Sequence, residues 1–147
     1  MEKKILGVDY GMARTGLACS DELGMYAHGI GNIKSYVPER AADEIVKKAE
    51  ELGVSLIVIG KPVNMDGSCG EKAQSAMALG AMISERTTIP VELYDERCTT
   101  VLAHKYLRES GLKTKNHRDV VDSLAAQIIL QDFMDRQKVQ NNKEKKD

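Results

Sequence analysis

One continuous apolar segment, residues 54–60 (VSLIVIG), limits the folds open to this chain of 147 residues. A run of this kind is typical of a strand buried on both faces, inside a sheet that carries helices on either side. The preceding segment starts at Pro38, stops at Gly53 and has apolar residues at helical spacing. A strand reached through a helical crossover is normally parallel to its neighbour. We therefore expect an α/β fold with a central strand at residues 54–60.

The other segments predict the rest of a mixed sheet. Residues 3–10, 14–20 and 25–33 read as short strands that form an antiparallel meander, the first two joined by a glycine turn. After the central strand we expect these elements: a helix from about Glu71 to Arg86, a strand led by Pro90, a helix from Thr99 or Thr100 to Gly111, and a final helix from about Asp119 to Gln137. The resulting order, β-β-β-α-β-α-β-α-α, predicts helices on both faces of the sheet.

Length and composition exclude several classes of protein. The chain fits one domain, which we place at residues 1–138, followed by a polar segment, 139–147, that we expect to be a disordered tail. The hydrophobic share of 42% is that of a soluble protein, and no apolar run approaches a bilayer span. With no signal-peptide pattern at the N-terminus, we expect a cytoplasmic location. The three cysteines follow no disulfide or zinc pattern and are expected to be reduced thiols: Cys19, Cys69 and Cys98.

The charge balance predicts where nucleic acid would be contacted. A net charge of −1 provides no general positive field, so such contacts require a local basic patch. The chain has no Trp, one Phe and five Tyr, which argues against a platform of stacked bases. Backbone phosphates are therefore the expected point of contact.

Three acids stand in apolar or strand-terminal surroundings. Asp9 ends the first apolar strand, Glu96 follows the last strand, and Asp122 lies among apolar residues of the final helix. In open sheets of this kind, sites collect at the carboxyl ends of the parallel strands. Because buried carboxylates without a partner are costly, we expect a cation among them, and Mg²⁺ or Mn²⁺ suits carboxylate ligands. One or two such ions support hydrolysis of phosphodiesters.

Six basic residues are candidates for nucleic-acid binding: Arg14, Lys61, Arg97, Lys113, Lys115 and Arg118. A guanidinium fork suits phosphate oxygens. Lys61 opens a glycine loop before a helix N-terminus, where free N–H groups can receive a phosphate. Structural salt bridges are the alternative for the arginines, and simple solvation is the alternative for the basic run at residues 113–118.

Each acid also has a plainer interpretation that the sequence leaves open. Asp9 can fix a turn, since Asp favours turns. Asp122 can be a first-turn acid of a helix capped by Asp119, where the helix dipole favours it. Glu96 can form a surface pair with Arg97, which contributes less than about 1 kcal/mol.

Four segments, in this order, resemble the signature regions of the YqgF/RuvX family: GVDYGMARTGLA, GKPVNMDGSCG, DERCTT and VVDSLAAQIILQDFMD. The resemblance covers residues 4 to about 135. The family is similar in fold to RNase H and the RuvC resolvase, which implies an RNase H-like three-layer fold. It also implies that the metal-binding and catalytic acids are Asp9, Glu96 and Asp122. Two features depart from the family pattern, namely Lys61, where an apolar residue is common, and the additional acid Asp119.

The family is described as a pre-16S rRNA nuclease and was earlier described as a Holliday junction resolvase. The resemblance thus implies a Mg²⁺-dependent nuclease acting on structured RNA, with precursor 16S rRNA or the small ribosomal subunit as partner and 5′-end processing as its role. One alternative is cleavage of branched DNA, and another is a non-catalytic RNA-binding assembly factor. DYGMARTG also resembles the phosphate hairpin of actin-like and sugar-kinase ATPases, but those close two lobes over a nucleotide and this chain has the length of one.

Overall fold

The computed structural model describes residues 4–64, 66–95 and 117–145, and within the last helix the side chains of residues 123–138. Its elements are β1 (Ile5–Asp9), β2 (Arg14–Ser20), β3 (Ala27–Lys34), α1 (Pro38–Leu52), β4 (Leu56–Lys61), α2 (Glu71–Arg86), β5 (Val91–Asp95) and α4 (His117–Lys145). The strands form one sheet in the order β3-β2-β1-β4-β5. β1, β2 and β3 are antiparallel neighbours, whereas β1, β4 and β5 run parallel. The mixed sheet predicted from the sequence is confirmed.

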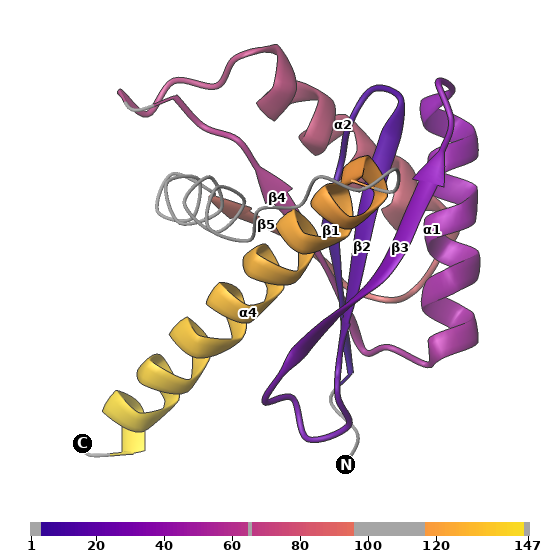
Figure 1. Cartoon of the computed structure of the whole chain (residues 1–147). Coiled ribbons are helices and arrows are strands. Elements are labelled where there is room, and N and C mark those ends of the chain that lie inside the picture. The colour runs from indigo at the N-terminus through magenta and orange to yellow at the C-terminus, as the bar shows by residue number, and fades with distance from the viewer. Residues whose placement is uncertain (1–3, 65, 96–116, 146–147) are drawn as a thin grey trace.

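Helices cover both faces of the sheet (Figure 1). α4 lies across one face, and α1 and α2 lie side by side on the other. Alternate residues of β1 divide between the two sides, because Leu6 and Val8 join the buried cluster with α1 and α2 while Ile5 joins the cluster with α4. We call these sides the α1/α2 face and the α4 face.

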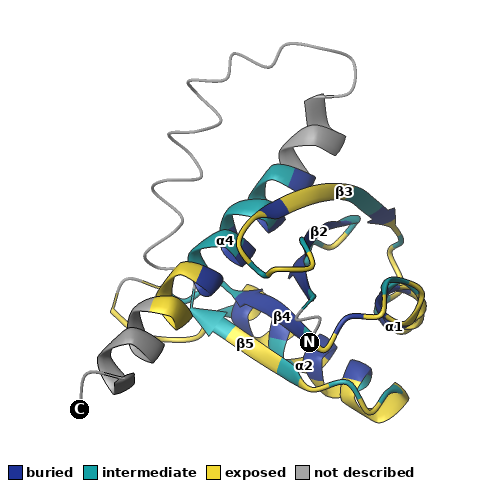
Figure 2. Cartoon of the chain, turned by 90° about the horizontal axis from the view of Figure 1, so that it is seen from below, coloured by how far each residue is buried: buried dark blue, intermediate teal, exposed yellow. Residues whose placement is uncertain are grey.

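The central strand is the most deeply buried part of the sheet. β4 pairs with β1 on one side and β5 on the other, and its four inner residues are buried (Figure 2). Ile57 and Ile59 contact the cluster of the α1/α2 face, and Val58 contacts that of the α4 face. Burial on both sides explains why these four inner residues are all apolar rather than alternating with polar ones.

The crossover helix α1 has the boundaries that the sequence predicted. It begins at Pro38, and it ends before Gly53, whose φ of 69° lies in the left-handed region. The Gly53 N–H donates to the Glu50 carbonyl at 3.2 Å, and the Val54 N–H donates to the Ala49 carbonyl at 3.2 Å. These bonds satisfy the last carbonyls of the helix and turn the chain directly into β4.

Two glycines allow α4 to lie very close to the sheet. A Cβ atom at Gly7 would stand 2.8 Å from the Leu130 Cβ and 3.2 Å from the Ala126 carbonyl oxygen. A Cβ at Gly29 would stand 2.0 Å from the Ser123 hydroxyl. The absence of side chains at these positions therefore sets the distance between the helix and β1 and β3.

The turn between β2 and β3 is held by one carboxylate. Asp21 accepts the Met25 N–H at 2.8 Å and the Tyr26 N–H at 3.3 Å. These backbone hydrogen bonds lower the pKa of Asp21, because they stabilise its charged form. The turn occupies residues that the sequence assigned to the third strand, so β3 begins at Ala27 instead of residue 25.

The last helix is longer than the sequence predicted. α4 starts at His117 and extends to Lys145, beyond the end expected at Gln137 and into the polar segment 139–147. Cys19 and Cys69 are free thiols, as predicted, while Cys98 and the helix expected up to Gly111 lie outside the described residues. No helix in the described part of the chain combines the length and apolarity needed to cross a membrane.

Candidate active site

Asp9 stands at the edge of the sheet where the parallel strands end, with Lys61 ending β4 and Asp95 ending β5. We call this the carboxyl edge. Asp9 is half-buried, and its strand partner on β2 is Gly16. It follows Gly7 by two residues, so it shares the face that α4 covers. The Asp9 side chain therefore belongs to the α4 face of the carboxyl edge.

The turn after Asp9 depends on Gly11. A Cβ atom at this position would stand 2.3 Å from the Arg14 carbonyl oxygen, which is too close for any residue with a side chain. Closing the β1–β2 hairpin thus accounts for this glycine of the motif. The hairpin returns Arg14 to the carboxyl edge, two residues from Gly16 and hence on the same face as Asp9.

α4 carries Asp122 to this part of the sheet. The hydroxyl of Ser123, the next residue, is buried and donates to the Leu17 carbonyl at 3.4 Å. Leu17 is the neighbour of Gly16, which pairs with Asp9. The first and last elements of the fold therefore meet beside Asp9, and the backbone of Asp122 lies in the turn of helix that makes this contact.

The other predicted site residues divide into two groups. Arg118 lies in the first turn of α4, where the structure describes the backbone alone. Four lie outside the described residues: Glu96, Arg97, Lys113 and Lys115. Lys61 is described and pairs with Asp95 across β4 and β5. Lys61 comes two residues after Ile59, whose side chain packs on the α1/α2 face, whereas Val58 packs on the α4 face. Because side chains two residues apart in a strand share a face, Lys61 belongs to the α1/α2 face, opposite Asp9.

A polar and aromatic cluster joins β5 to α4. The Tyr94 hydroxyl donates to the Asp132 carboxylate, which also accepts Arg136 Nε at 3.1 Å. The Arg136 guanidinium lies 5.7 Å from the centre of the Tyr94 ring, and Phe133 meets that ring edge-on at 5.8 Å. These contacts place Tyr94 on the α4 face and fix the strand that leads to Glu96 against the helix that bears Asp122.

Replacing Tyr94 by Phe tests this connection. We expect the free energy of unfolding to fall by about 1.5–3 kcal/mol, because a hydrogen bond to a charged carboxylate is lost while the ring packing is kept. Urea denaturation measures the change, and Tyr26→Phe, at an exposed position, is the matched control. An unchanged stability in Tyr94→Phe would contradict a structural role for the contact with Asp132.

Tyr10, which follows Asp9, faces the other side. Its ring contacts the cluster of the α1/α2 face. Burial raises the pKa of the Tyr10 phenol, and the nearby Glu39 carboxylate raises it further. The phenol therefore stays neutral at physiological pH and is no charged ligand for the Asp9 site.

The glycine loop between β4 and α2 is folded on itself. The Asn64 N–H donates to the Ser68 carbonyl at 3.0 Å, and the Gly67 N–H donates to the Asn64 carbonyl at 2.8 Å. Asp66 accepts the Ser68 N–H at 2.9 Å. At the following helix start, Gly70 provides no side-chain cap. The phosphate-binding role of this loop with Lys61 stays a prediction.

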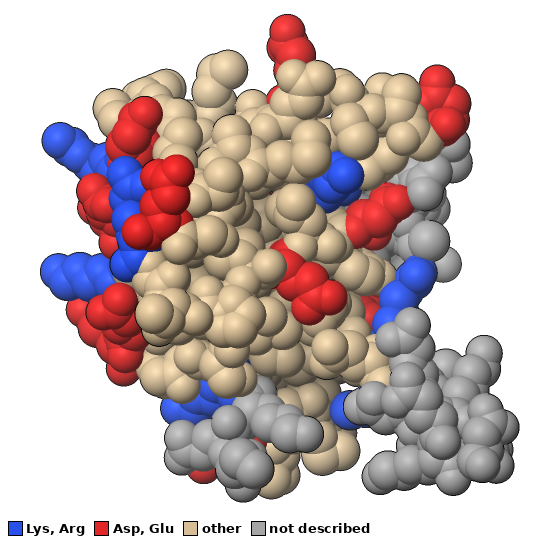
Figure 3. All heavy atoms as spheres, turned by 180° about the vertical axis from the view of Figure 1, so that it is seen from behind, with Lys and Arg blue, Asp and Glu red and all other residues tan. Residues whose placement is uncertain are grey.

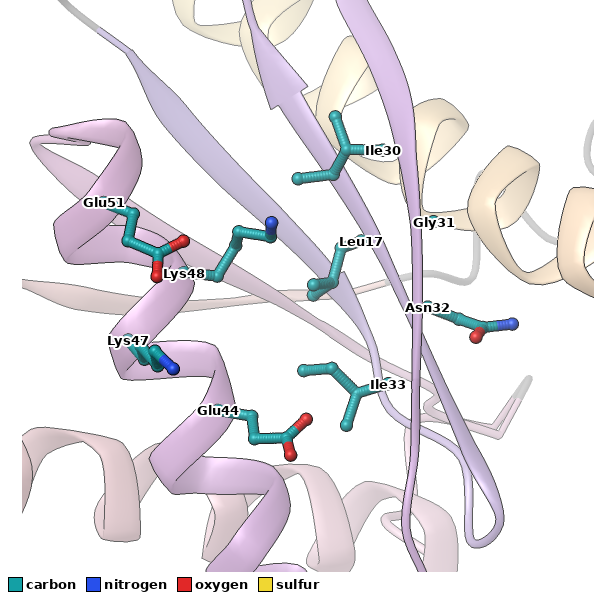
Figure 4. Close-up of a pocket in the computed structure, with 9 residues that line it drawn as sticks. All are labelled: Leu17, Ile30, Gly31, Asn32, Ile33, Glu44, Lys47, Lys48 and Glu51. Atoms are coloured by element: carbon teal, nitrogen blue, oxygen red, sulfur yellow. The ribbon is translucent and has the colours of Figure 1, made fainter.

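Two hollows lie beside β3, on different faces. The larger, about 410 Å³, lies between β3 and α1 and has an apolar floor of Leu17, Ile30 and Ile33. Figure 4 shows Lys48 and Glu51 along its α1 side and Asn32 directed away from it. This groove belongs to the α1/α2 face and is separated from Asp9 by the sheet.

The smaller hollow, about 280 Å³, lies at the carboxyl edge itself. Its lining residues are Ala13, Arg14, Lys34, Ser35 and Tyr36. The sequence analysis selected Arg14 but missed Lys34 and Tyr36. The signal for them is topological, because in an antiparallel meander the end of the third strand returns to the start of the second. Arg14 and Lys34 are direct partners across β2 and β3.

Among the residues that the structure describes, Asp9 is the one predicted acid whose side chain is described. These residues contain no group of three or more His, Cys, Asp and Glu that could hold a metal ion. Asp9 itself suits such an ion, since carboxylate oxygens are the ligands that Mg²⁺ prefers and this carboxylate is half-buried beside α4. The Asp9 carboxylate at the carboxyl edge therefore fits a divalent cation as a ligand.

Comparison with known proteins identifies relatives over nearly the whole chain. The model of the RuvX family, described as Holliday junction resolvase, matches residues 3–136. A protein of Clostridium botulinum (strain Eklund 17B / Type B) with the name "Putative pre-16S rRNA nuclease" is 41% identical over 133 residues, which are 90% of this chain and 97% of the relative. A Pelotomaculum thermopropionicum protein of the same name is 40% identical, covering 91% of this chain and 88% of the relative.

Resolvases are among the solved structures with a similar fold. RuvC of T. thermophilus, solved with a Holliday junction substrate, has a TM-score of 0.58 at 16% identity and covers 92% of this chain and 96% of its own. The Fowlpox virus resolvase, also solved with junction DNA, has a TM-score of 0.52 at 12% identity, covering 90% and 97%. These likenesses confirm the RNase H-like fold. With the family match and the relatives, they show that this chain belongs to the RuvX family of resolvase-like nucleases.

Proposed function

We propose that this chain is a divalent-metal-dependent nuclease that hydrolyses phosphodiester bonds in precursor 16S rRNA, with Asp9, Glu96 and Asp122 as its catalytic metal ligands. The observation that carries the proposal is the meeting of β1 and α4 at the carboxyl edge. There Asp9 occupies the α4 face, and the residue after Asp122 is bonded next to the strand partner of Asp9. Metal-binding acids from the two ends of the chain would converge there.

Strand alternation excludes Asp95, the neighbour of Glu96, from the proposed metal site. Tyr94 lies on the α4 face, where it contacts Asp132 and Phe133. Asp95, the next residue, belongs to the opposite face and lies across from Lys61 in the β4–β5 register. Glu96 is the acid that the family resemblance implies, and it lies outside the described residues. We therefore assign Glu96, not Asp95, to the proposed metal site.

The proposed roles of the chain's own residues follow from charge and position. The three carboxylates would hold Mg²⁺ or Mn²⁺, which when bound supplies an activated water and neutralises charge on the phosphate. Arg14, on the same face as Asp9, orients a phosphate oxygen through its guanidinium fork. The mixed charges over α1 and the sparsely charged surface beside them give the opposite face no uniformly positive surface (Figure 3). Substrate is therefore expected on the α4 face.

RNA is favoured as substrate by the relatives that are about 40% identical and are named for pre-16S rRNA. The related role would be maturation of the 5′ end during ribosome biogenesis in the cytoplasm. Branched DNA is the second candidate, because two resolvases solved with junction DNA share the fold. Symmetric junction cleavage needs two sites, so a stable dimer would favour this second candidate.

Direct cleavage assays test the proposal. End-labelled precursor 16S rRNA and a four-way DNA junction are incubated with the purified protein in Mg²⁺, in Mn²⁺ and with a chelator. The same assay is run with Asp9→Asn, Glu96→Gln and Asp122→Asn. We expect metal-dependent cutting of the RNA, its loss in all three variants, and an intact junction.

Other outcomes change the conclusion in defined ways. Cutting of the junction but not of the RNA would support the second candidate, a resolvase that acts on branched DNA. Cutting by all three variants at the wild-type rate would remove the assigned acids from the site. Binding of precursor rRNA without cutting, under every metal condition, would leave an assembly factor that retains the fold.

A further inference from the structure

We infer that the hollow lined by Ala13, Arg14, Lys34, Ser35 and Tyr36 is a subsite for one unpaired nucleotide of the substrate strand. A base stacks on Tyr36, and a phosphate is held between Arg14 and Lys34. The inference rests on the proposed function, because it extends the substrate path outward from Asp9. It also specifies the substrate, which must present a single-stranded segment beside the bond that is cut.

Strand pairing places the two cations on the face of Asp9. Arg14 and Lys34 are directly opposed across β2 and β3, and opposed residues of neighbouring strands project to the same face. The Asp9–Gly16 pair lies two residues further into the sheet, which is about 7 Å at the rise of a strand. A strand with its reacting phosphate at Asp9 therefore has a neighbouring phosphate within reach of both cations.

Tyr36 provides the surface for a base. It is 82% exposed in the connection between β3 and α1 and lines the same hollow as the two cations. The Ser35 N–H donates to the Ala13 carbonyl at 3.0 Å, which ties this connection to the β1–β2 turn. An exposed aromatic ring on a fixed backbone beside two positive charges matches the chemistry of an unpaired nucleotide, namely a π face next to a phosphate.

The low aromatic content of the chain does not oppose this subsite. It excludes a platform of several rings, whereas one nucleotide needs one ring. A base inside a duplex is stacked on its neighbours and cannot stack on Tyr36. The subsite therefore distinguishes unpaired from paired strands, which phosphate contacts alone do not.

Binding measured without cleavage tests the subsite. Fluorescence anisotropy gives Kd for a short labelled single-stranded RNA, and for the same RNA in a full duplex, with a chelator present. We expect Tyr36→Leu to raise the single-strand Kd by about 5- to 150-fold, the effect of losing one base stacked on an aromatic ring, with duplex binding unchanged. Tyr36→Phe keeps the ring and is expected to bind as wild type does.

Matched variants separate this effect from general ones. Tyr26, 61% exposed in the turn at the other end of β3, gives Tyr26→Leu as the control for losing an exposed ring. Lys34→Gln is expected to reduce the slope of log Kd against log salt for single strands by about 0.7, the value for one phosphate contact. Lys47→Gln, on α1, is the charge control and is expected to leave that slope unchanged.

These experiments distinguish a failure of the subsite from a failure of the proposed function. Wild-type RNA affinity in Tyr36→Leu, or an equal loss for single strand and duplex, would overturn the subsite even if the three acid variants abolish cutting. Conversely, a loss of affinity in Tyr36→Leu for single-stranded RNA but not for the duplex would support the subsite even if those acid variants cut as wild type does. Absence of affinity for single-stranded RNA in the wild-type protein would also overturn it.

Discussion

Asp9→Asn is expected to lower the rate of RNA cleavage by about 1,000-fold or more and to leave the protein folded. A metal-bound site supplies several kcal/mol of stabilisation to the transition state, and each 1.36 kcal/mol is a factor of ten in rate. Asn has nearly the same shape as Asp but lacks its charge, so the strand end and its pairing with Gly16 are retained. Single-turnover cleavage and thermal unfolding, measured on the same preparation, separate activity from stability.

This substitution also decides between the two interpretations of Asp9. Asn favours turns as Asp does, so a carboxylate that only fixes the turn is replaced with little effect. A matched control is Asp43→Asn, which removes an exposed ion pair with Arg86 Nε at 2.6 Å on α1. We expect this variant to cut at the wild-type rate. Equal rates for Asp9→Asn and Asp43→Asn would refute the ligand role.

Gly7→Ala is expected to destabilise the protein by about 1–3 kcal/mol, the usual cost of excess volume in a well-packed core. The new methyl group would lie 2.8 Å from the Leu130 Cβ and 3.2 Å from the Ala126 carbonyl oxygen. Neither atom moves unless α4 moves. Because α4 also carries Asp122, we expect cleavage by the folded fraction to fall as well. Urea denaturation gives the stability, and rates are corrected for the fraction folded.

A second glycine provides the contrast. A methyl group at Gly80, inside α2, would meet Ile59 and Val91 side-chain atoms at 3.6 Å, which is ordinary contact. Gly80→Ala is expected to be neutral or to stabilise by up to about 1 kcal/mol, since Ala favours a helix over Gly. If both substitutions changed stability equally, the close approach of α4 at Gly7 would not be the cause.

The sequence predicts those parts of the fold whose signals are local. Pro38 and Gly53 mark the ends of α1 because each acts through its own backbone, one at a helix start and one at a left-handed stop. The apolar run of β4 identifies a central strand because burial on two faces favours apolar residues at its four inner positions. The family resemblance is confirmed for the same reason, since its motifs are continuous segments of the chain.

The register between strands, and the face of the sheet on which each side chain lies, depend on contacts between distant segments. The sequence leaves both open. The position of Lys61 on the face opposite Asp9 depends on how β4 alternates between two helix layers. The pairing of Arg14 with Lys34 depends on strand alignment over a separation of twenty residues and a bulge between Leu17 and Ala18. Long-range pairing of this kind decides which candidates share a surface, so the acids could be selected from sequence more readily than the residues around them.

The contact of α4 with β1 and β2 affects when the proposed site forms during synthesis of the chain. β1 precedes α4 in the chain and is therefore synthesised first, so the proposed set of acids is complete only after α4 has emerged from the ribosome and docked. Until then the nascent chain holds Asp9 without Asp122. A chain assembled in this order would gain the proposed nuclease activity only once α4 has docked on β1 and β2, and not while its first strands are being made.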